Sequence, residues 1–304
     1  MPHSIRRPSL HRLAPLAAIL LAACATPHFD VDEAIRFQDG KTRFVAFAQN
    51  KTGWVLRGVS DVEVRFIVDG QEVAAAVTDE RGFAKAIVTL EKPAERFEAN
   101  ASFGGEEHLS EAEVVAWRND RVIVACDIDA TISNTSLGAL FFDEFDETST
   151  PIEGSPETLT EIDRDFHVVY LTARPRFTLE KTRHWLDVHG YPRAPVITSL
   201  TVGDALGQTT YKTRTLNSVR KHYTNLLIGI GNTDIDAASY GIHDMLVLLV
   251  QPDEVPTRVD NVFRFQTWQQ IRAFFRDNRE LLRDPKRVQA VVRGEETLKL
   301  PQTH

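Results

Sequence analysis

Two patterns of hydrophobic and polar residues divide the chain. Between residues 42 and 118, apolar and polar positions alternate in short runs, which predicts strands that each bury one face. From residue 119 onward, apolar runs alternate with stretches of helical periodicity, which is typical of a parallel sheet between helices. We therefore predict a small all-β sandwich at 42–118, a doubly wound α/β domain at 119–285, and a C-terminal tail at 286–304.

The predicted sandwich contains six or seven short strands joined by turns. Asp69-Gly70 is a strong hairpin signal, and the segment TDERGFA at 78–84 resembles a turn of bacterial immunoglobulin-like domains. This region shows no cluster of metal-ligating or catalytic residues, so we interpret it as a spacer or as a module that binds a protein partner. The expected strands are 43–48, 62–68, 72–78, 83–90, 96–103 and 111–117.

The α/β region opens with Val122–Cys126, a run of small, apolar or β-branched residues that predicts a strand buried on both faces. Further strands are expected at 167–171, 195–199, 225–230, 245–250 and 262–265, and helices at 155–163, 177–189, 211–223 and 267–283. The last helix carries a basic stripe, which is either a solvated face or a contact for anionic lipid. The stripe consists of Arg272, Arg276, Arg279 and Arg283.

Residues 1–23 resemble a secretory signal peptide. Three arginines precede the apolar run Leu13–Ala23, which is shorter than the ~20 helical residues that span a bilayer. Leu21-Ala22-Ala23-Cys24 resembles the lipobox of bacterial lipoproteins, which implies a lipid anchor (palmitate) on Cys24 and a linker over 24–41. Ala25, where Asp would favour the inner membrane, points to the outer membrane, facing the periplasm. An ordinary cleaved signal followed by a chance cysteine is the alternative.

The net charge and the cysteine content argue against some classes of function. The net charge of −8 makes the chain a poor candidate for binding nucleic acid. With Cys24 acylated, Cys126 is the remaining cysteine, so no disulfide can form within one chain. Cys126 lies in the most apolar predicted strand, where a small core residue is a better interpretation than a catalytic thiol.

Candidate chemistry collects at the carboxyl ends of the predicted strands. Asp127 and Asp129 follow the first strand directly, and in open α/β sheets the carboxyl ends of the strands form the ligand-binding edge. Two carboxylates this close repel each other unless a cation or a shared proton offsets the charge, and Mg²⁺ prefers such oxygen ligands. A solvated acidic turn is the simpler alternative. The same edge is expected to receive Thr131, Thr172, Arg174, Lys212, Asn232, Asp234 and Asp236. Acids for a metal beside hydroxyl and basic donors for an anion favour phosphoryl transfer.

Four sequence blocks resemble the haloacid-dehalogenase phosphatase superfamily, and within it the lipin-type phosphatidate phosphatases and the lipin-like domain of phosphatidylinositol-transfer proteins. The blocks are DIDATIS at 127–133, VVYLTARP at 168–175, YKTRTLNSVRK at 211–221 and IGNTDIDAASY at 230–240. The resemblance covers about Val122–Val250 and implies a haloacid-dehalogenase-like, Rossmann-type sheet with a minimal cap.

The resemblance also implies roles for the residues at the sheet edge. Asp127 would be the nucleophile that forms an aspartyl-phosphate, and Asp129 would protonate the leaving oxygen and then activate water. Lys212 would balance the charge of nucleophile and phosphate. Thr131, Thr172 and Arg174 would bind the substrate, and Mg²⁺ would be held by Asp127, Asp129 through its carbonyl, Asn232 and Asp236. The role of Asp234 stays open, between a contribution through water and an exposed turn residue.

Departures from the family pattern and chain length bear on the substrate. Ala130 replaces a Gly, Thr233 an Arg and Thr172 a Ser, and the interval between Thr131 and residue 155 leaves little room for a cap. An open site suits a bulky or membrane-bound phosphate, so we predict phosphatidate or a related lipid phosphate. The alternatives are a surface acid phosphatase for nucleotides or other small phosphomonoesters, a phosphoprotein phosphatase, and a non-catalytic phosphatidate-binding module, against which the presence of Asp129 argues. Leu137, Leu140, Phe141 and Phe142 could meet acyl chains or belong to the core.

Overall fold

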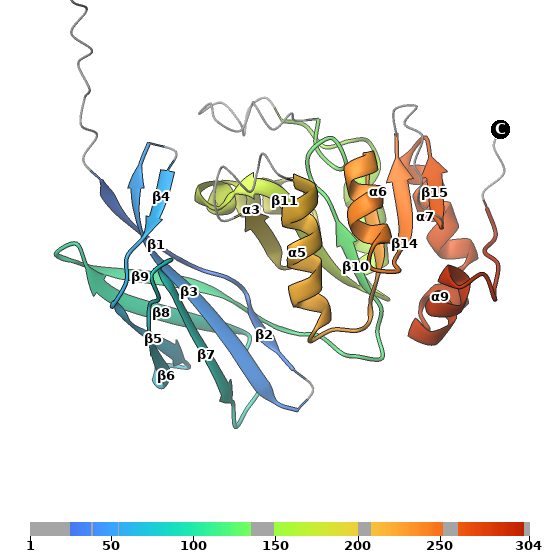
Figure 1. Cartoon of the computed structure of the whole chain (residues 1–304). Coiled ribbons are helices and arrows are strands. Elements are labelled where there is room, and N and C mark those ends of the chain that lie inside the picture. The colour runs from blue at the N-terminus through green and yellow to red at the C-terminus, as the bar shows by residue number, and fades with distance from the viewer. Residues whose placement is uncertain are drawn as a thin grey trace, which may run out of the picture.

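The structure is a computed structural model that describes residues 25–37, 39–53, 55–134, 149–199, 208–251 and 261–300. The predicted signal peptide, Cys24 and the apolar residues at 137–142 lie outside these ranges. Within them, no helix has both the length and the apolar character that crossing a membrane requires. An all-β region lies beside an α/β region, with helix α5 (Gln208–Arg220) facing the strands (Figure 1).

The all-β region is one sheet of nine strands that encloses its own core. Its order is β1-β3-β2-β9-β8-β5-β6, and β4 and β7 also pair with β3. Alternation along Glu63–Val68 places Val64, Phe66 and Val68 inside, where they meet Phe44 and Phe97 from other strands. The strands are β1 (Thr26–Val31), β2 (Ala34–Arg36), β3 (Lys41–Thr52), β4 (Val55–Gly58), β5 (Glu63–Val68), β6 (Gln71–Val77), β7 (Phe83–Thr89), β8 (Arg96–Phe103) and β9 (Glu106–Ala116).

The segment expected to be a linker at 24–41 is instead part of this sheet. β1 pairs antiparallel with β3. β2 lies between β3 and β9 in the sheet, antiparallel to β3 and parallel to β9. Val31 and Ala34 are fully buried. The apolar residues of 26–36 are few and are interrupted by charge, so alternation within the segment is weak. Pairing with distant strands supplies the order that the local pattern lacks.

The α/β region contains a six-stranded parallel sheet in the order β12-β11-β10-β13-β14-β15. The doubly wound fold class is thereby confirmed. The strands are β10 (Ile123–Cys126), β11 (His167–Pro175), β12 (Val196–Ser199), β13 (Leu226–Gly231), β14 (Leu246–Val250) and β15 (Val262–Phe265). The helices are α2 (Ser155–Asp163), the 3₁₀ turn η2 (Arg176–Thr178), α3 (Leu179–Val188), α5, α6 (Asp234–Gly241), α7 (Trp268–Asp277), α8 (Arg279–Leu282) and α9 (Pro285–Val292).

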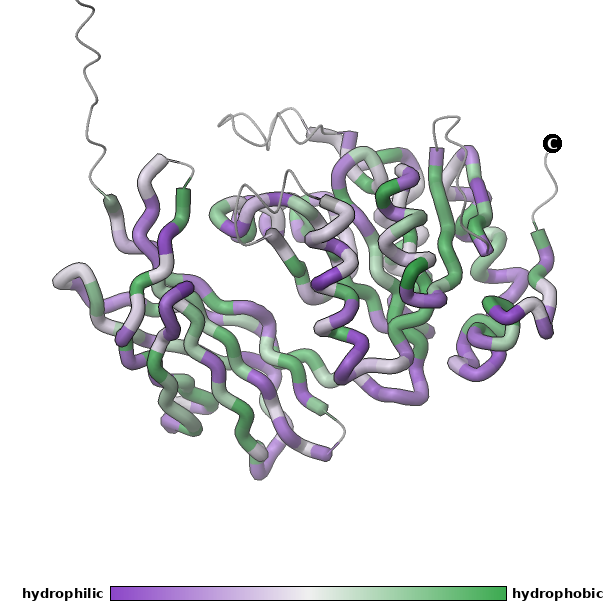
Figure 2. Tube along the Cα trace, viewed as in Figure 1, coloured by the Kyte–Doolittle hydropathy of each residue, from purple (hydrophilic) through white to green (hydrophobic). Residues whose placement is uncertain are grey.

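Helices cover both faces of this sheet, so β10 is buried on each side. Val124 and Cys126 face a core formed with α2, α3, α7, α8 and α9, whereas Ile123 and Ala125 face a core formed with α5 and α6. Figure 2 shows hydrophobic residues, in green, along the central strands of this sheet. The predicted tail at 286–304 is therefore wrong for its first part, because Val288 of α9 is fully buried in the first core.

The basic stripe on the last helices pairs with acids of its own chain. Arg272 Nε lies 2.5 Å from Glu161 Oε2 of α2, and Arg279 Nε lies 2.6 Å from Asp165 Oδ2. Arg283 approaches the same Asp165 at 3.6 Å, and Arg276 pairs with Asp277. These contacts tie α7 and α8 to the end of α2, which weakens the case for the stripe as a lipid contact.

A buried ion pair joins the two regions. Arg176 of η2 is 2 % exposed, and its Nε and Nη1 donate to Asp30 Oδ1 and Asp32 Oδ1, each at 2.7 Å. Its guanidinium also lies 3.1 Å from the centroid of the Phe47 ring. Burial would raise the pKa of Asp30, but the charge of Arg176 outweighs it and holds that pKa below its usual value. This ion pair therefore connects the all-β region to the residues that directly follow β11.

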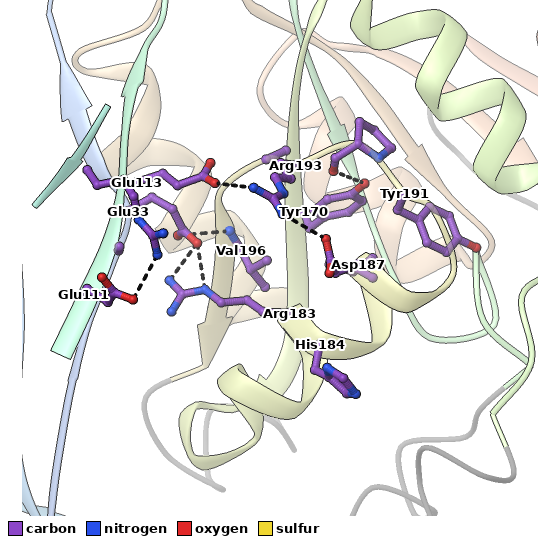
Figure 3. Close-up of a pocket in the computed structure, with 15 residues that line it drawn as sticks. Glu33, Glu111, Glu113, Tyr170, Arg183, His184, Asp187, Tyr191, Arg193 and Val196 are labelled. Carbon is purple, nitrogen blue, oxygen red and sulfur yellow. Dashed lines mark hydrogen bonds and ion pairs between the residues drawn. The ribbon is translucent and has the colours of Figure 1, made fainter. Parts of the chain in front are cut away.

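A second set of contacts surrounds a cavity of about 320 Å³ between the regions (Figure 3). Arg183 of α3 donates from Nε to Glu33 Oε1 at 2.7 Å, and the backbone N–H of Val196 donates to Glu33 Oε2 at 3.4 Å. Arg193 reaches both Glu113 and Asp187 at 3.4 Å. The charges that line this cavity are therefore largely paired with one another.

Arg176→Ala is expected to lower the free energy of unfolding by about 3–5 kcal/mol, because it leaves the carboxylate of Asp30 buried without its partner. The matched control is Arg193→Ala, which breaks a solvent-exposed pair at the same boundary and should cost no more than about 1 kcal/mol. Urea denaturation followed by circular dichroism compares the two. Equal midpoints for both variants would contradict this account of the boundary.

Candidate active site

Asp127 stands at the carboxyl end of β10 with 5 % of its surface exposed. Its Oδ1 accepts a hydrogen bond from Lys212 Nζ at 2.7 Å, and its Oδ2 accepts one from Thr131 Oγ1 at 3.1 Å. Lys212 comes from α5, which packs against β11 and α6 and so carries the ammonium to the sheet edge. The structure therefore brings Asp127, Thr131 and Lys212 together at the sheet edge, where the sequence predicted them.

Asp236 shares the same lysine. Lys212 Nζ donates to Asp236 Oδ1 at 2.5 Å, while Asp236 Oδ2 accepts from the backbone of Asn232 and from Thr233 Oγ1 at 2.8 Å. Thr233 and Asp236 form a capping box that begins α6. We did not predict this helix, although Thr-x-x-Asp is its sequence signal. Gly231 is required beside it, since a Cβ there would lie 2.4 Å from Asp236 Cγ.

Burial and charge set the protonation of this cluster. Burial, only partly offset by Lys212 and reinforced by Asp236 and Asp129, raises the pKa of Asp127 to about 7. Burial acts the same way on Asp236, but Lys212 and the Thr233 hydrogen bond hold its pKa below the usual value. Burial would lower the pKa of Lys212, yet the two carboxylates raise it above the ordinary value. The lysine therefore stays charged, and Asp127 is the carboxylate that takes up a proton most readily.

Asp129 is held by residues of β11. Thr172 Oγ1 donates to Asp129 Oδ2 at 3.2 Å, and the guanidinium of Arg174 donates from Nη2 to Oδ1 at 2.9 Å and from Nε to both carboxylate oxygens at 3.1 Å. The Arg174 side chain is fully buried, whereas that of Asp129 is 12 % exposed. Arg174, predicted to bind substrate, is fully buried here, and its guanidinium orients the Asp129 carboxylate.

Two residues that sequence reasoning missed complete the support of Arg174. Thr182 Oγ1 of α3 accepts from Arg174 Nη1 at 3.1 Å, and Ser133 Oγ lies 3.5 Å from Arg174 Nη2. Thr182 is remote in sequence from every motif, and a threonine inside a predicted helix carries no signal for this role. Ser133 ends the DIDATIS block, which was a weak signal that it lies near the site.

The loop after Asp129 turns sharply at Ala130, which has a φ of 57°. This left-handed backbone costs a non-glycine residue about 1–2 kcal/mol, which explains the glycine of the related pattern. The turn is secured because Trp268 Nε1 donates to the carbonyl of Thr131 at 2.9 Å. The methyl of Ala130 therefore adds backbone strain without preventing the turn.

Asn232 and Asp234 differ in their placement. Asn232 Oδ1 accepts from Thr131 Oγ1 at 3.1 Å, which puts the amide on the same hydroxyl as Asp127. Asp234, at the first residue of α6, is exposed and favours the helix N-terminus by its charge. Asp234 could either contribute through water or be an exposed turn residue, and its exposure agrees with the second of these.

The oxygen donors at the edge fit Mg²⁺. Among the residues described, no three His, Cys, Asp or Glu side chains gather into a metal-binding group. Mg²⁺, however, is commonly held by one or two carboxylates with waters and substrate oxygens. Asp127 and Asp236 converge on one ammonium, and the Asn232 oxygen lies beside them through Thr131. This donor set consists of hard oxygens, most of them anionic, as the ion requires.

The fold and edge define an α/β protein with an Asp-x-Asp-x-Thr box facing a lysine and a second acidic turn. A family model described as "PITM 1-3, LNS2 domain" matches residues 124–246, and no curated protein sequence matches the chain. The matched range contains Asp127, Asp129, Lys212 and Asp236, so the chain is similar to an LNS2 domain over the part that forms this edge.

Several solved structures are similar to the chain over part of its length. A haloacid-dehalogenase-superfamily hydrolase from Geobacter sulfurreducens shares 11 % identity over 50 % of this chain and 95 % of its own, with a TM-score of 0.37. A predicted phosphoglycolate phosphatase from Haemophilus somnus shares 12 % identity over 50 % and 96 %, also with a TM-score of 0.37. The M1 domain of titin shares 15 % identity over 30 % of this chain and 94 % of its own, with a TM-score of 0.23.

Proposed function

We propose that this protein is a Mg²⁺-dependent phosphatase that hydrolyses a phosphomonoester through an aspartyl-phosphate. The observation that carries the proposal is the pairing of a buried Asp127 with Lys212 and Asp236, next to an Asp129 whose carboxylate reaches the surface. A strand end that only terminated in an acidic turn would leave its carboxylates in solvent.

Each residue has a defined task in this reaction. A carboxylate oxygen of Asp127 attacks phosphorus, the bond from phosphorus to the ester oxygen breaks, and Asp129 gives that oxygen a proton. Asp129 then takes a proton from water as the water attacks the aspartyl-phosphate, which releases phosphate and restores Asp127. Thr172 and Arg174 support the second step, since they hold Asp129 as a hydrogen-bond acceptor. Lys212 offsets the negative charge that gathers at Asp127.

When bound, Mg²⁺ would neutralise charge on the phosphoryl oxygens, with Asp127, Asp236, Asn232 and the Asp129 carbonyl as candidate ligands. The exposed Asp234 provides a matched control, because it belongs to the same turn without lying in the buried cluster.

Mg²⁺ is expected to raise the thermal unfolding midpoint of chelator-treated protein, and to raise it more at pH 8 than at pH 5.5. The metal-free fold binds a proton on Asp127 up to about pH 7, whereas the unfolded chain releases it near 4. The contribution of Asp127 to stability therefore falls as pH rises through this window, and a cation replaces the lost proton. Differential scanning fluorimetry should show this shift in wild type and Asp234→Asn and not in Asp127→Asn. An equal shift in all three proteins would place the ion elsewhere.

Phosphatidate or a related lipid phosphate is our proposed substrate. The family match to an LNS2 domain supports this class, and so does the short interval between the first motif and α2, which limits the size of any cap. A phosphate projecting from a membrane can reach an open sheet edge without a closing domain. The alternatives are a surface acid phosphatase for nucleotides and a phosphatidate-binding module without turnover.

A phosphate-release screen separates these possibilities. Phosphatidate vesicles, nucleotide monophosphates, sugar phosphates and phosphopeptides are compared with and without Mg²⁺. We expect Mg²⁺-dependent turnover that is fastest on phosphatidate. Faster turnover of nucleotides would support the acid-phosphatase alternative, and binding of phosphatidate without release of phosphate would support the binding module.

We also propose that Cys24 carries lipid and attaches the protein to the cell envelope, at the outer membrane facing the periplasm. The Leu-Ala-Ala-Cys sequence after an apolar run supports this. Two or more acyl chains, at about 0.8 kcal/mol per buried CH₂, would hold the protein durably. Mass spectrometry of the mature N-terminus and fractionation of Cys24→Ser test the anchor. An unmodified N-terminus at another residue would rule it out.

A further inference from the structure

A second groove lies between the two regions, on the side of the sheet opposite α3. It measures about 380 Å³ and is bounded by β3 and β7 on one wall and by α5 on the other. These elements face each other in Figure 1. We call it the basic groove, since five cationic side chains and two acidic ones line it. The cations are Arg43, Arg81, Lys85, Arg176 and Arg214, and the acids are Asp32 and Asp79.

The two walls present regular faces to the groove. On β3, Arg43, Val45 and Phe47 alternate onto one side, and the strand register sets Lys85 opposite Val45 and Phe83 opposite Phe47. On α5 the groove-lining residues follow helical spacing, at 211, 214, 215 and 218. Lys212 lies on another side of the same helix, where it contacts Asp127 and Asp236. The basic groove and the candidate active site are thus separate.

The acids in the groove are already engaged. Asp32 Oδ1 pairs with Arg176 at 2.7 Å, and Asp79 Oδ1 accepts the backbone N–H groups of Arg81 and Phe83 at 2.9 and 3.0 Å. In the part of the chain that the structure describes, Arg43, Arg81 and Lys85 have no carboxylate partner. The cavity of Figure 3 differs in this respect, since its arginines are paired with glutamates and an aspartate.

Two buried polar atoms also lack partners. Arg43 Nε and Thr198 Oγ1 are buried and make no hydrogen bond to any described residue. Thr198 as a whole is only 5 % exposed. A buried polar group without a partner costs about 1–3 kcal/mol, so a ligand that paired with these two atoms would recover part of that cost. A concentration of uncompensated cations is also unfavourable in the free protein, and it stands out in a chain of net charge −8.

We propose that the basic groove binds a small anion with two or more phosphate groups, either free or as the headgroup of a lipid. Arginines offer planar, paired donors that match phosphate oxygens, and the lining hydroxyls of Thr198, Thr215 and Ser218 add donors between them. Arg43, Arg81 and Lys85, the three lining cations without a carboxylate partner among the described residues, carry more positive charge than one phosphate would neutralise. Because the groove is separate from Asp127, this proposal does not rest on the phosphatase activity.

Calorimetric titration with pyrophosphate and tripolyphosphate tests the proposal, with a chelator present to suppress hydrolysis. We expect Arg81→Gln with Lys85→Gln, both at exposed positions, to weaken binding by about tenfold or more. The matched control is Lys286→Gln with Arg293→Gln on α9 and just after it, which removes the same charge from the far end of the molecule and should bind as wild type does. Equal affinity in both double variants would overturn the proposal.

Thr198→Val provides a second test, because it leaves the charge of the groove unchanged and so separates a specific contact from a general charge effect. It removes the buried hydroxyl and keeps the shape, so we expect unchanged or higher thermal stability together with weaker binding of tripolyphosphate. Co-sedimentation with phosphatidylcholine vesicles, with and without cardiolipin, then distinguishes the two sources of the anion. Vesicle binding that the groove variant loses indicates a lipid headgroup, and binding of the soluble probes alone indicates a free anion. Binding of neither probe would overturn the proposal.

Discussion

Asp127→Asn is expected to reduce phosphate release by more than about 10⁴-fold while the protein stays folded, the scale on which loss of a nucleophile acts. A carboxamide cannot form the acyl-phosphate, and it removes one charged oxygen from the candidate metal site. The fold should survive because Lys212 keeps Asp236 as a partner at 2.5 Å, so no buried charge is left alone. Phosphate release and circular dichroism on the same preparation measure both effects.

Asp234→Asn is the control for this experiment, since it makes the same chemical change on an exposed acid at the same sheet edge. Its turnover should stay close to that of wild type. If Asp127→Asn retained turnover within tenfold of wild type, Asp127 would not be the nucleophile and the proposed mechanism would fail.

Asp129→Asn is expected to slow turnover by about 10²–10⁴-fold, the range for loss of a general acid–base group. With its oxygen in the Oδ2 position, the amide can still accept from Thr172 Oγ1 and Arg174 Nε, so the loop geometry should persist while proton transfer is lost. Substrates with poor leaving groups depend most on protonation of the ester oxygen. The loss should therefore be larger for an alkyl phosphate than for p-nitrophenyl phosphate when formation of the aspartyl-phosphate is measured.

Rapid-quench kinetics on both substrates provides that comparison. An Asp129→Asn enzyme with near-normal rates on both would assign the acid–base role to another group. A loss that was identical for both leaving groups would show that Asp129 acts through position and charge rather than by proton transfer.

The outline of the α/β region was predictable because its signals are local. Val122–Cys126 has no polar residue, which is possible only for a strand covered on both faces, and helix α2 matches its predicted range. Asp127, Asp129, Lys212 and Asp236 could be assigned to one edge because parallel strands all end on the same side. In the all-β region, alternation identified β5 to β8 within about one residue, and in β5 and β8 every second side chain is buried.

Other features depend on partners that are distant in sequence. Only the packing of β10 beside β11 shows that Arg174, which was predicted to bind substrate, is fully buried and pairs with Asp129. Segment 26–36 forms strands because β3 and β9 supply hydrogen-bond partners, and α9 forms where Val288 can be buried. Asp30 and Arg176 are separated by 146 positions, so no pattern along the chain could pair them.

The sequence by itself determined the two-part organisation, the parallel sheet and the set of candidate catalytic residues, because periodicity and strand ends are properties of neighbouring residues. The tertiary structure decided which of those residues are exposed, which hold one another, and how the two regions join. It also revealed the basic groove, whose walls come from strands β3 and β7 and from helix α5. Burial, ion pairing and cavity shape arise between distant segments, and those quantities separate a residue that meets the substrate from one that supports it.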